Sequence, residues 1–579
     1  MCGLLGLVGE GSIAAARLGL VDLMRHRGPD GEGRHLSDQV GLAMRRLAII
    51  DLETGEQPVA NEAGDVVCVL NCEIYTYREL RAELASAGHV FRGEGDVEVV
   101  PHLYEQHGDA FVDRLRGMFA LALWDERRRR LLVARDRFGI KPLYVAELPG
   151  EVAVASEIAP LLALGASDEP DSEAISDYLA FGYVPGGATG LRGVRRLLPG
   201  HLLVWENGRA REHRYWTPAP RPAPIEQTLR DAIRLHLRSD VPLGVLLSGG
   251  LDSSLIAALA ADEVEEPLRT FSVGFKDAEY DEREHARVVA ATIGSRHEEL
   301  VVETAIAEDL PTIAASLEQP LADPAAIPLW YLCRAVAGEV KVALAGDGGD
   351  EVFGGYSRYA WDRHAARLGR LLPRAALAGI LGRLPQGSGR KNLPRRAVKL
   401  LRHAAKPEAE RYFSWFALEN GRAARFEQLF REAPERLSAL GRLQYVDLHS
   451  MLTDNLMLKA DKLSMAHSLE LRVPFLDHEV VEVGLGLPDS DKVRGVRTKV
   501  ALRRLVAERF PAAIARRPKQ GFDVPLERWL DGELRELAGD VLDADTRALP
   551  AEQRYAFLML ELWRDGLRRR RAEPLSARV

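Results

Sequence analysis

The feature that most constrains the fold is a change in hydrophobic pattern partway along the chain. In residues 1–160, short apolar runs alternate with turns rich in Gly and Asp, with two or three helices interspersed; the runs are Val66–Leu70, Phe119–Trp124, Leu131–Ala134 and Val152–Ala155. This pattern predicts a β-rich unit. After about residue 225, the strand-like Val241–Leu247 precedes a helix-like Ser253–Ala261, and such pairs recur. Buried strands that alternate with helices predict a parallel sheet covered on both faces.

The length of the chain predicts more than one domain, because 579 residues exceed what one hydrophobic core usually supports. Many Pro and Gly residues between 166 and 225 indicate a connection between domains. We therefore predict a first domain over 1–165, an interdomain connection over 166–225 and a second domain over 226–579. Within the second domain we expect further strands at Thr270–Phe275 and Val340–Ala345, and a mostly helical part from about residue 360.

The composition excludes several classes of protein. A net charge of −8 gives no reason to expect a nucleic-acid partner. No apolar stretch approaches the ~20 residues that span a bilayer, so no membrane partner is expected. Four cysteines in so long a chain do not make a disulfide framework, and we expect a protein of the reducing cytoplasm.

Cys2 directly follows the initiator Met1 and precedes Gly3. Removal of Met1 would leave Cys2 with a free α-amino group beside its own thiol. That amine, with a reference pKa of about 8, can accept the thiol proton and act as a built-in general base. Cys2 is therefore the candidate nucleophile.

Six ordered sequence blocks surround this candidate. They are Met1–Gly3, His26–Gly31, Arg46–Asp51, Asn71–Tyr75, Gly95–Glu98 and Ala134–Tyr144. Together they resemble the glutamine amidohydrolase domain of class II amidotransferases. The resemblance implies an α+β N-terminal-nucleophile fold, in which antiparallel sheets are layered with helices.

The resemblance also implies a glutamine site. Its expected members are Arg46, Ile50, Asn71, Glu73 and Asp96. Arg46 would pair with the glutamine α-carboxylate, a bidentate task suited to guanidinium, and Asp96 would pair with the α-amino group. Asn71 would donate its side-chain amide to the oxyanion of the tetrahedral intermediate, and the backbone N–H of Cys72 would be the second donor.

Cys72 departs from the family pattern, which has Gly at this position. Gly often marks a positive φ or a close approach, which a Cβ and a thiol would penalise. We therefore expect Cys72 to strain the loop or to intrude on the glutamine site. The alternative is an ordinary negative φ, with the thiol packed away from Cys2.

The run Ser248-Gly249-Gly250-Leu251-Asp252-Ser253-Ser254 lies between a predicted strand and a predicted helix. Glycine N–H groups, serine hydroxyls and a helix N-terminus together favour phosphate binding. The Gly-Lys-Ser/Thr ending of a Walker A loop is missing. The run resembles the pyrophosphate loop of the ATP pyrophosphatase superfamily, which cleaves ATP between the α and β phosphates. The ATP-binding residues this implies are Leu247, Ser248, Gly249, Gly250, Asp252, Ser253, Val273, Ala345, Gly346 and Lys462.

A second acidic loop, Ala345–Tyr356, follows the predicted strand Val340–Ala345. The carboxyl ends of parallel strands are where ligands bind. This loop resembles that of glutamine-hydrolysing asparagine synthetases, which implies that Asp252 and Asp350 hold Mg²⁺. Asp347 stands where the family often has Glu, in a position implicated in acid–base work.

Two later segments also fit this family. Lys462, within Asp461–Met465, would reach the ATP phosphates and neutralise the charge that develops as pyrophosphate leaves. The segment Arg517–Phe522 is expected to close over the site.

We expect an enzyme that hydrolyses glutamine at Cys2 and passes ammonia to a carboxylate activated as an acyl-adenylate by MgATP. The favoured acceptor is aspartate, giving asparagine, AMP and pyrophosphate. One alternative is a related amidotransferase acting on another carboxylate in secondary-metabolite or polysaccharide biosynthesis. Another is a non-catalytic binding protein of the same fold. The sequence leaves open whether the chain forms a homodimer.

Overall fold

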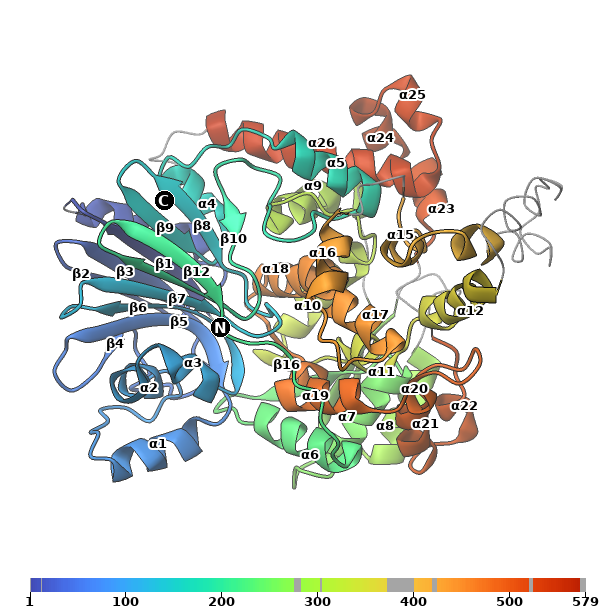
Figure 1. Cartoon of the computed structure of the whole chain (residues 1–579), viewed down its shortest axis with the longest axis horizontal. Coiled ribbons are helices and arrows are strands. Elements are labelled where there is room, and N and C mark those ends of the chain that lie inside the picture. Colours follow the sequence, from blue (N-terminus) through green and yellow to red (C-terminus); the bar gives the residue numbers. More distant parts are fainter. Residues whose placement is uncertain are drawn as a thin grey trace.

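The computed structural model describes residues 2–11, 13–274, 283–301, 305–371, 400–418, 424–519 and 524–572, without the side chains of 570–572. Its first half holds two stacked six-stranded antiparallel sheets, in the orders β10-β8-β9-β1-β3-β2 and β12-β11-β7-β6-β5-β4 (Figure 1). The strands are β1 Cys2–Gly9, β2 Gly31–Leu36, β3 Val40–Arg46, β4 Val59–Ala60, β5 Val66–Ile74, β6 Gly117–Asp125, β7 Arg130–Arg135, β8 Tyr144–Leu148, β9 Glu151–Ala155, β10 Arg195–Arg196, β11 His201–Glu206 and β12 Arg209–Arg214. The helical segments of this half are η1 Ala15–Met24, α1 Tyr77–Ser86, α2 Val99–His107, η2 Gly108–Ala110, α3 Phe111–Arg114, α4 Ile158–Ala163 and α5 Ser172–Phe181.

The alternation of residues along β5 explains this layering. Val67 and Val69 point between the sheets, where they meet Leu4 and Leu42 of the first sheet. Their neighbours, Leu70 among them, belong to a separate core that includes residues of α1 and α2. A strand buried on both faces fits a position inside a layered domain. The expected layered antiparallel architecture is confirmed.

The segment 166–225 differs from the loose connection we expected. It contains α5, β10, β11 and β12, and β11 pairs with β7 through five residue pairs from Leu202 to Glu206. Its glycines make turns within ordered structure, as at Gly200, where φ is +65°. The abundance of Pro and Gly here reflects turns and short edge strands rather than a linker.

The second half is built on a parallel five-stranded sheet of order β15-β14-β13-β16-β17, which confirms the predicted α/β class. Its strands are β13 Leu243–Leu246, β14 Arg269–Gly274, β15 Arg296–Val301, β16 Val342–Leu344 and β17 Glu470–Arg472. The predicted strand Thr270–Phe275 corresponds to β14, and Phe275 lies outside the described residues. Figure 1 shows most helices of the second half gathered around this sheet or on its side away from the antiparallel sheets, whereas the long helix α26 (Ala551–Ala572) lies beside α5 of the first half.

The helical elements of the second half run to the end of the described chain. They are α6 Ile225–His236, α7 Leu251–Ala261, α8 Arg283–Ile293, α9 Ile306–Leu317, α10 Ala326–Ala337, α11 Gly349–Phe353, α12 Ser357–Leu371, α15 Glu408–Phe413, α16 Ala424–Glu432, α17 Ala439–Leu448, the π-helical turn η4 Leu452–Met457, α18 Leu458–Met465, η5 Pro474–Leu476, α19 His478–Gly486, α20 Asp489–Lys492, α21 Val500–Ala507, α22 Ala512–Ala515, α23 Leu526–Asp531, α24 Arg535–Val541, α25 Ala544–Arg547 and α26 Ala551–Ala572. Among the helices described, none is long and apolar enough to cross a membrane.

Buried ion pairs join the two halves. The guanidinium of Arg27, in the first half, is fully buried and lies 2.8 Å from a carboxylate oxygen of Asp461 in α18. Arg472 of β17 pairs with Glu73 of β5 at 2.7 Å, also out of solvent. A buried charge that loses its partner is costly, so these pairs hold the two halves in one arrangement.

Candidate active sites

The first site is a small pocket at the start of β1. Cys2 lies opposite Arg46 of β3 in antiparallel register. Six of the residues predicted from the sequence to act on glutamine line this pocket: Cys2, Arg46, Ile50, Cys72, Glu73 and Asp96.

Asn71, the remaining member of the predicted glutamine set, contacts Cys2 directly. Its Oδ1 accepts a hydrogen bond from the backbone N–H of Cys2 at 2.9 Å. Its Nδ2 is buried and has no hydrogen-bond partner among the described residues. A buried amide donor without a partner costs free energy, and such groups often mark a place for a ligand atom. The geometry therefore leaves one donor available beside Cys2.

The surroundings of Cys2 favour the protonated form of its thiol. Burial raises its pKa, although a hydrogen bond from the backbone N–H of Leu47 and the charge of Arg46 act in the opposite direction. Because the thiolate is the nucleophile, Cys2 needs a base to become reactive.

Arg46 and Asp96 bring one positive and one negative charge to this pocket. The guanidinium of Arg46 donates to the backbone carbonyls of Ile50 and Asp51, which orients it. Oδ2 of Asp96 accepts a hydrogen bond from the N–H of Ile74 at 2.8 Å, and burial raises the pKa of this carboxyl. A fixed cation and a carboxyl group suit the carboxylate and amine of a free amino acid.

Cys72 lies within β5, paired in antiparallel register with Phe119, and its φ is not positive. The expectation of a strained backbone is therefore wrong, because an extended strand accepts any side chain with a Cβ. The alternative is the better description, because Cys72 packs in the core that includes residues of α1 and α2, whereas Cys2 packs in the core between the sheets. Cys72 is among the residues that line the Cys2 pocket, and its Sγ lies 3.8 Å from Oδ2 of Asp96. Burial raises the pKa of Cys72 well above its usual value, which keeps this thiol protonated.

Glu73 lines the pocket, but its carboxylate is committed elsewhere. Oε2 of Glu73 accepts a hydrogen bond from Arg472 at 2.7 Å, and the same guanidinium pairs with Glu470 at 2.6 Å. Any contact of Glu73 with glutamine is thus left to its backbone, because the side chain links the two halves of the chain.

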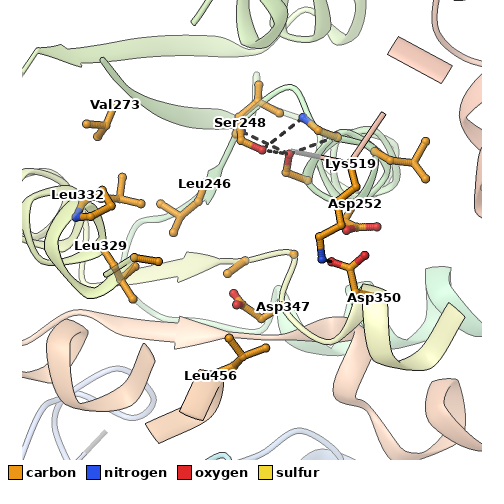
Figure 2. Close-up of a pocket in the computed structure, with 18 of the residues that line it drawn as sticks. Leu246, Ser248, Asp252, Val273, Leu329, Leu332, Asp347, Asp350, Leu456 and Lys519 are labelled. Atoms are coloured by element: carbon orange, nitrogen blue, oxygen red, sulfur yellow. Dashed lines mark hydrogen bonds and ion pairs between the residues drawn. The ribbon is translucent and has the colours of Figure 1, made fainter. Parts of the chain in front are cut away.

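The second site is a cavity of about 1120 Å³ at the carboxyl ends of β13 and β16. Eight of the residues predicted to bind ATP line it: Leu247, Ser248, Gly250, Asp252, Ser253, Val273, Ala345 and Gly346. Figure 2 shows Val273, Leu246 and Leu329 toward one end, and Ser248, Asp252, Asp350 and Lys519 toward the other. The cavity thus has an apolar end and a charged end.

Gly249, also predicted to bind ATP, does not line the cavity. Its φ is +65°, and a Cβ there would lie 2.5 Å from the backbone of His285 in α8. Gly249 therefore turns the loop and lets α8 pack closely. Ser248 Oγ accepts a hydrogen bond from the N–H of Gly250 at 3.2 Å and lies 3.0 Å from Ser253 Oγ, which closes the loop over the start of α7.

The ammonium of Lys499 lies between Asp252 and Asp350 and pairs with both carboxylates. The ammonium of Lys499 pairs with Asp252 and lies 2.6 Å from Asp350, and Lys519 lies 2.6 Å from the other oxygen of Asp350. Burial acts to raise the pKa of Asp350, but the charges of Lys499 and Lys519 outweigh it and hold the pKa at about 2. Both carboxylates thus face cationic groups.

Asp347 also lines the cavity. Burial raises the pKa of its carboxyl, the charge of Lys459 lowers it, and Asp252 and Asp350 raise it further. A carboxyl whose pKa is raised can hold and release a proton nearer to neutral pH than an exposed Asp.

Lys462 does not line this cavity, contrary to the predicted role on the ATP phosphates. Its side chain is fully buried, with the ammonium 2.6 Å from Glu318 and 3.7 Å from Glu157. Burial acts to lower its pKa, but these two carboxylates outweigh it and keep the ammonium charged. The carboxylate of Glu318 also accepts hydrogen bonds from the N–H groups of Ile158 and Ala159 at 2.8 and 2.9 Å, at the start of α4. Lys462 thus belongs to the contact between the halves.

The cations that do line the cavity include Lys459, Lys499, Arg517 and Lys519. Lys499 was missed from the sequence because nothing near it resembles a phosphate loop. Its distinctive local feature appears only in the structure, where it adopts a left-handed φ of 50° just before α21. Arg517 and Lys519 come from the segment expected to close over the site; residues 520–522 of that segment lie outside the described part of the chain.

Comparison with known proteins places both sites in one family. The glutamine amidotransferase domain matches residues 1–216, and asparagine synthase matches residues 224–577. Asparagine synthetase [glutamine-hydrolyzing] 1 of Bacillus subtilis is 34% identical over 97% of this chain and 93% of its own length. Asparagine synthetase [glutamine-hydrolyzing] 3 of the same organism is 29% identical over 87% of this chain and 83% of its own. Amidase chry2 of Gibberella zeae is 29% identical over 90% of this chain and 87% of its own. The chain is therefore a glutamine-dependent amidotransferase that belongs to the family of glutamine-hydrolysing asparagine synthetases.

Proposed function

We propose that this enzyme converts aspartate to asparagine, with glutamine as the nitrogen donor and ATP as the source of activation. The observation that carries the proposal is the presence, in one chain, of the Cys2 pocket and the cavity that holds the Ser248–Ser253 loop. The names of the Bacillus relatives support aspartate as the acceptor.

In the glutaminase half, Cys2 would attack the amide carbon of glutamine and release ammonia. With Met1 removed, the α-amine of Cys2 would take the thiol proton. Asn71 is oriented by its bond to the nitrogen of Cys2, so its unpaired Nδ2 would donate to the oxyanion. One such donor accounts for about 10²–10³ in kcat. Arg46 and Asp96 would hold the α-carboxylate and the α-amine.

In the synthetase half, the charged end of the cavity would bind the ATP phosphates. The N-terminus of α7 and the loop Ser248–Ser253 supply backbone and hydroxyl donors for pyrophosphate. Lys499, Lys519 and Arg517 would neutralise the charge that builds up as pyrophosphate leaves. The apolar end, with Leu247 and Val273, suits the adenine base. AMP would be left on the acceptor carboxylate until ammonia displaces it, with Asp347 taking part in proton transfer.

Asp252 and Asp350 fit a Mg²⁺ ion. Oδ1 of Asp252 is buried and makes no hydrogen bond in the described structure, so it is free to coordinate. Magnesium prefers carboxylate and phosphate oxygens, and both Asp side chains lie at the phosphate end of the cavity. A bound Mg²⁺ would supply charge neutralisation on the polyphosphate.

The test measures glutaminase activity, ATP–pyrophosphate exchange and amide product on one preparation. Cys2→Ala should abolish glutamine use and leave ammonia as a working nitrogen donor, and Asp252→Asn or Asp350→Asn should lose exchange but keep glutaminase activity. Loss of ammonia-dependent synthesis in a folded Cys2→Ala protein would refute the division of labour.

The acceptor is tested by screening carboxylic acids for pyrophosphate release. If another carboxylate gives product and aspartate gives none, that carboxylate replaces aspartate as the proposed acceptor. The similarity to Amidase chry2 is the reason to test this outcome. No exchange with any acceptor would favour a non-catalytic protein. Size-exclusion chromatography of the same preparation tests for a homodimer.

A further inference from the structure

Four side chains that can bind a metal meet on the outer side of the glutaminase half, away from the two sites above. Glu62 lies in the turn between β4 and β5, and His89 follows α1. His102 and Glu105 lie one turn apart on α2, so they share a face of that helix. The fold thus collects ligands from three segments.

Their ligand atoms lie close enough together to hold a single ion. One ligand atom from each residue can be chosen so that all four lie within 4.8 Å of one another. Nδ1 of His89 and Nδ1 of His102 lie 3.2 and 3.3 Å from the two oxygens of Glu62, and Nδ1 of His89 lies 3.9 Å from Glu105. Bonds of about 2.0–2.2 Å in a tetrahedral zinc site give ligand–ligand distances of about 3.3–3.6 Å. The two imidazoles thus lie at about the required distance from Glu62, whereas Glu105 would move closer when an ion binds.

The second observation is the state of His102. Its side chain is fully buried; Nδ1 lies 3.3 Å from Glu62 without forming a hydrogen bond to it, and Nε2 has no hydrogen-bond partner among the described residues. Buried polar groups without partners are rare in folded proteins and call for an explanation.

The surrounding groups orient the carboxylates. The backbone N–H of Val90 donates to Glu62 at 2.7 Å, and Asn61 Nδ2 donates to Glu105 at 3.2 Å. Such contacts fix ligand orientation in metal sites. The side chains of Glu62 and Glu105 remain 33% and 40% exposed, which leaves a path for an ion from solvent.

We propose that Glu62, His89, His102 and Glu105 form a binding site for Zn²⁺. Two imidazoles with two carboxylates favour zinc over the oxygen-seeking ions Mg²⁺ and Ca²⁺. The ion would tie α2 to the segments before it. Because residues 89 and 102 bracket Asp96, it would also hold in place the segment that carries one wall of the Cys2 pocket. This inference is independent of the acceptor and of the ATP chemistry.

The experiment measures zinc bound by the tag-free full-length protein, by elemental analysis after dialysis and by calorimetric titration. The wild type should bind one Zn²⁺ per chain at this site, and Co²⁺ should give the intense visible absorption of a four-coordinate site. His89→Ala and Glu105→Gln, whose side chains reach the surface, should weaken binding at least tenfold. His107→Ala, on the same helix but outside the cluster, is the matched control.

Two further variants test whether the zinc is bound by Cys2 instead and whether His102 is a ligand. Cys2→Ala should retain the bound zinc. That result would exclude the Cys2 thiol as a ligand. His102→Ala should lose it, and circular dichroism reports whether that variant is folded; if it is not, His89→Ala and Glu105→Gln decide. A wild type that binds no zinc, or equal affinity in wild type, His89→Ala and Glu105→Gln, overturns the proposal.

Discussion

Lys462→Met separates a structural role for this lysine from a role on ATP. The ammonium lies 2.6 Å from Glu318 in a site without solvent. Removal of one partner from a buried ion pair costs about 3–5 kcal/mol, because the other charge is left uncompensated. Glu318 keeps two backbone donors and Glu157 keeps Arg27 at 3.3 Å, so we expect the low end, about 3 kcal/mol.

The assay pairs denaturant unfolding, followed by tryptophan fluorescence, with the KM for ATP in pyrophosphate exchange. We expect the unfolding midpoint of Lys462→Met to fall while its KM for ATP stays within about threefold. The double variant Lys462→Met/Glu318→Gln should recover part of the loss, because it no longer buries a lone carboxylate. Lys406→Met, which removes an exposed ion pair with Glu410, should change stability by less than about 0.5 kcal/mol. Loss of exchange with an unchanged unfolding midpoint would refute this reasoning and return Lys462 to the phosphates.

Three further variants test other parts of the structure. Lys499→Met should lose ATP–pyrophosphate exchange by at least 100-fold and keep glutaminase activity; a normal exchange rate would remove Lys499 from the ATP site. Cys72→Gly should keep kcat/KM for glutamine within about threefold and lower the free energy of unfolding by about 1 kcal/mol, because Gly in a strand interior carries an entropic cost; a tenfold rise in kcat/KM would restore the strain hypothesis. Burial lowers the pKa of His236 to about 4, so the unfolded state binds the extra proton and stability should fall as pH drops from about 6.5 to 4; His236→Gln should flatten that slope in denaturant midpoints measured across this range.

Local patterns were enough to predict a β-rich first domain, a parallel sheet in the second, and the approximate positions of the key strands. The strand-to-helix passage at Ser248–Ser253 carries its own signal, because glycine and serine must meet a helix start for phosphate to bind there. The role of Cys2 could also be predicted locally, because its position directly after Met1 is what would give it a free α-amine beside its thiol. The β-rich character of the first domain followed from turn spacing and its layered sheets from the family resemblance, although the strands of 166–225 were hidden by their prolines and glycines.

Long-range pairing could not be predicted in the same way. Lys462 sits among residues typical of the family, so its neighbours suggested a ligand contact, but its burial against Glu318 depends on how two halves dock. Lys499 has no motif, and it reaches Asp252 across 247 positions of sequence. The commitment of Glu73 to Arg472 likewise spans 399 positions. Such partners are specified by tertiary packing rather than by local spacing.

The pairing of Arg27 with Asp461 also has a consequence for how the chain is made. The two residues are 434 positions apart, so a ribosome adding about 5–20 residues per second needs roughly 20–90 s to supply the second after the first. Once β12 has been made, the nascent glutaminase half has all its strands and one carboxylate for this buried guanidinium, Glu157 at 3.3 Å, but it still lacks the closer Asp461. Water must solvate Arg27 until α18 emerges, so the docking face stays open and hydrated while the first sheets form. Synthesis of α18, rather than completion of the first domain, then sets the earliest time at which that face can dry and close.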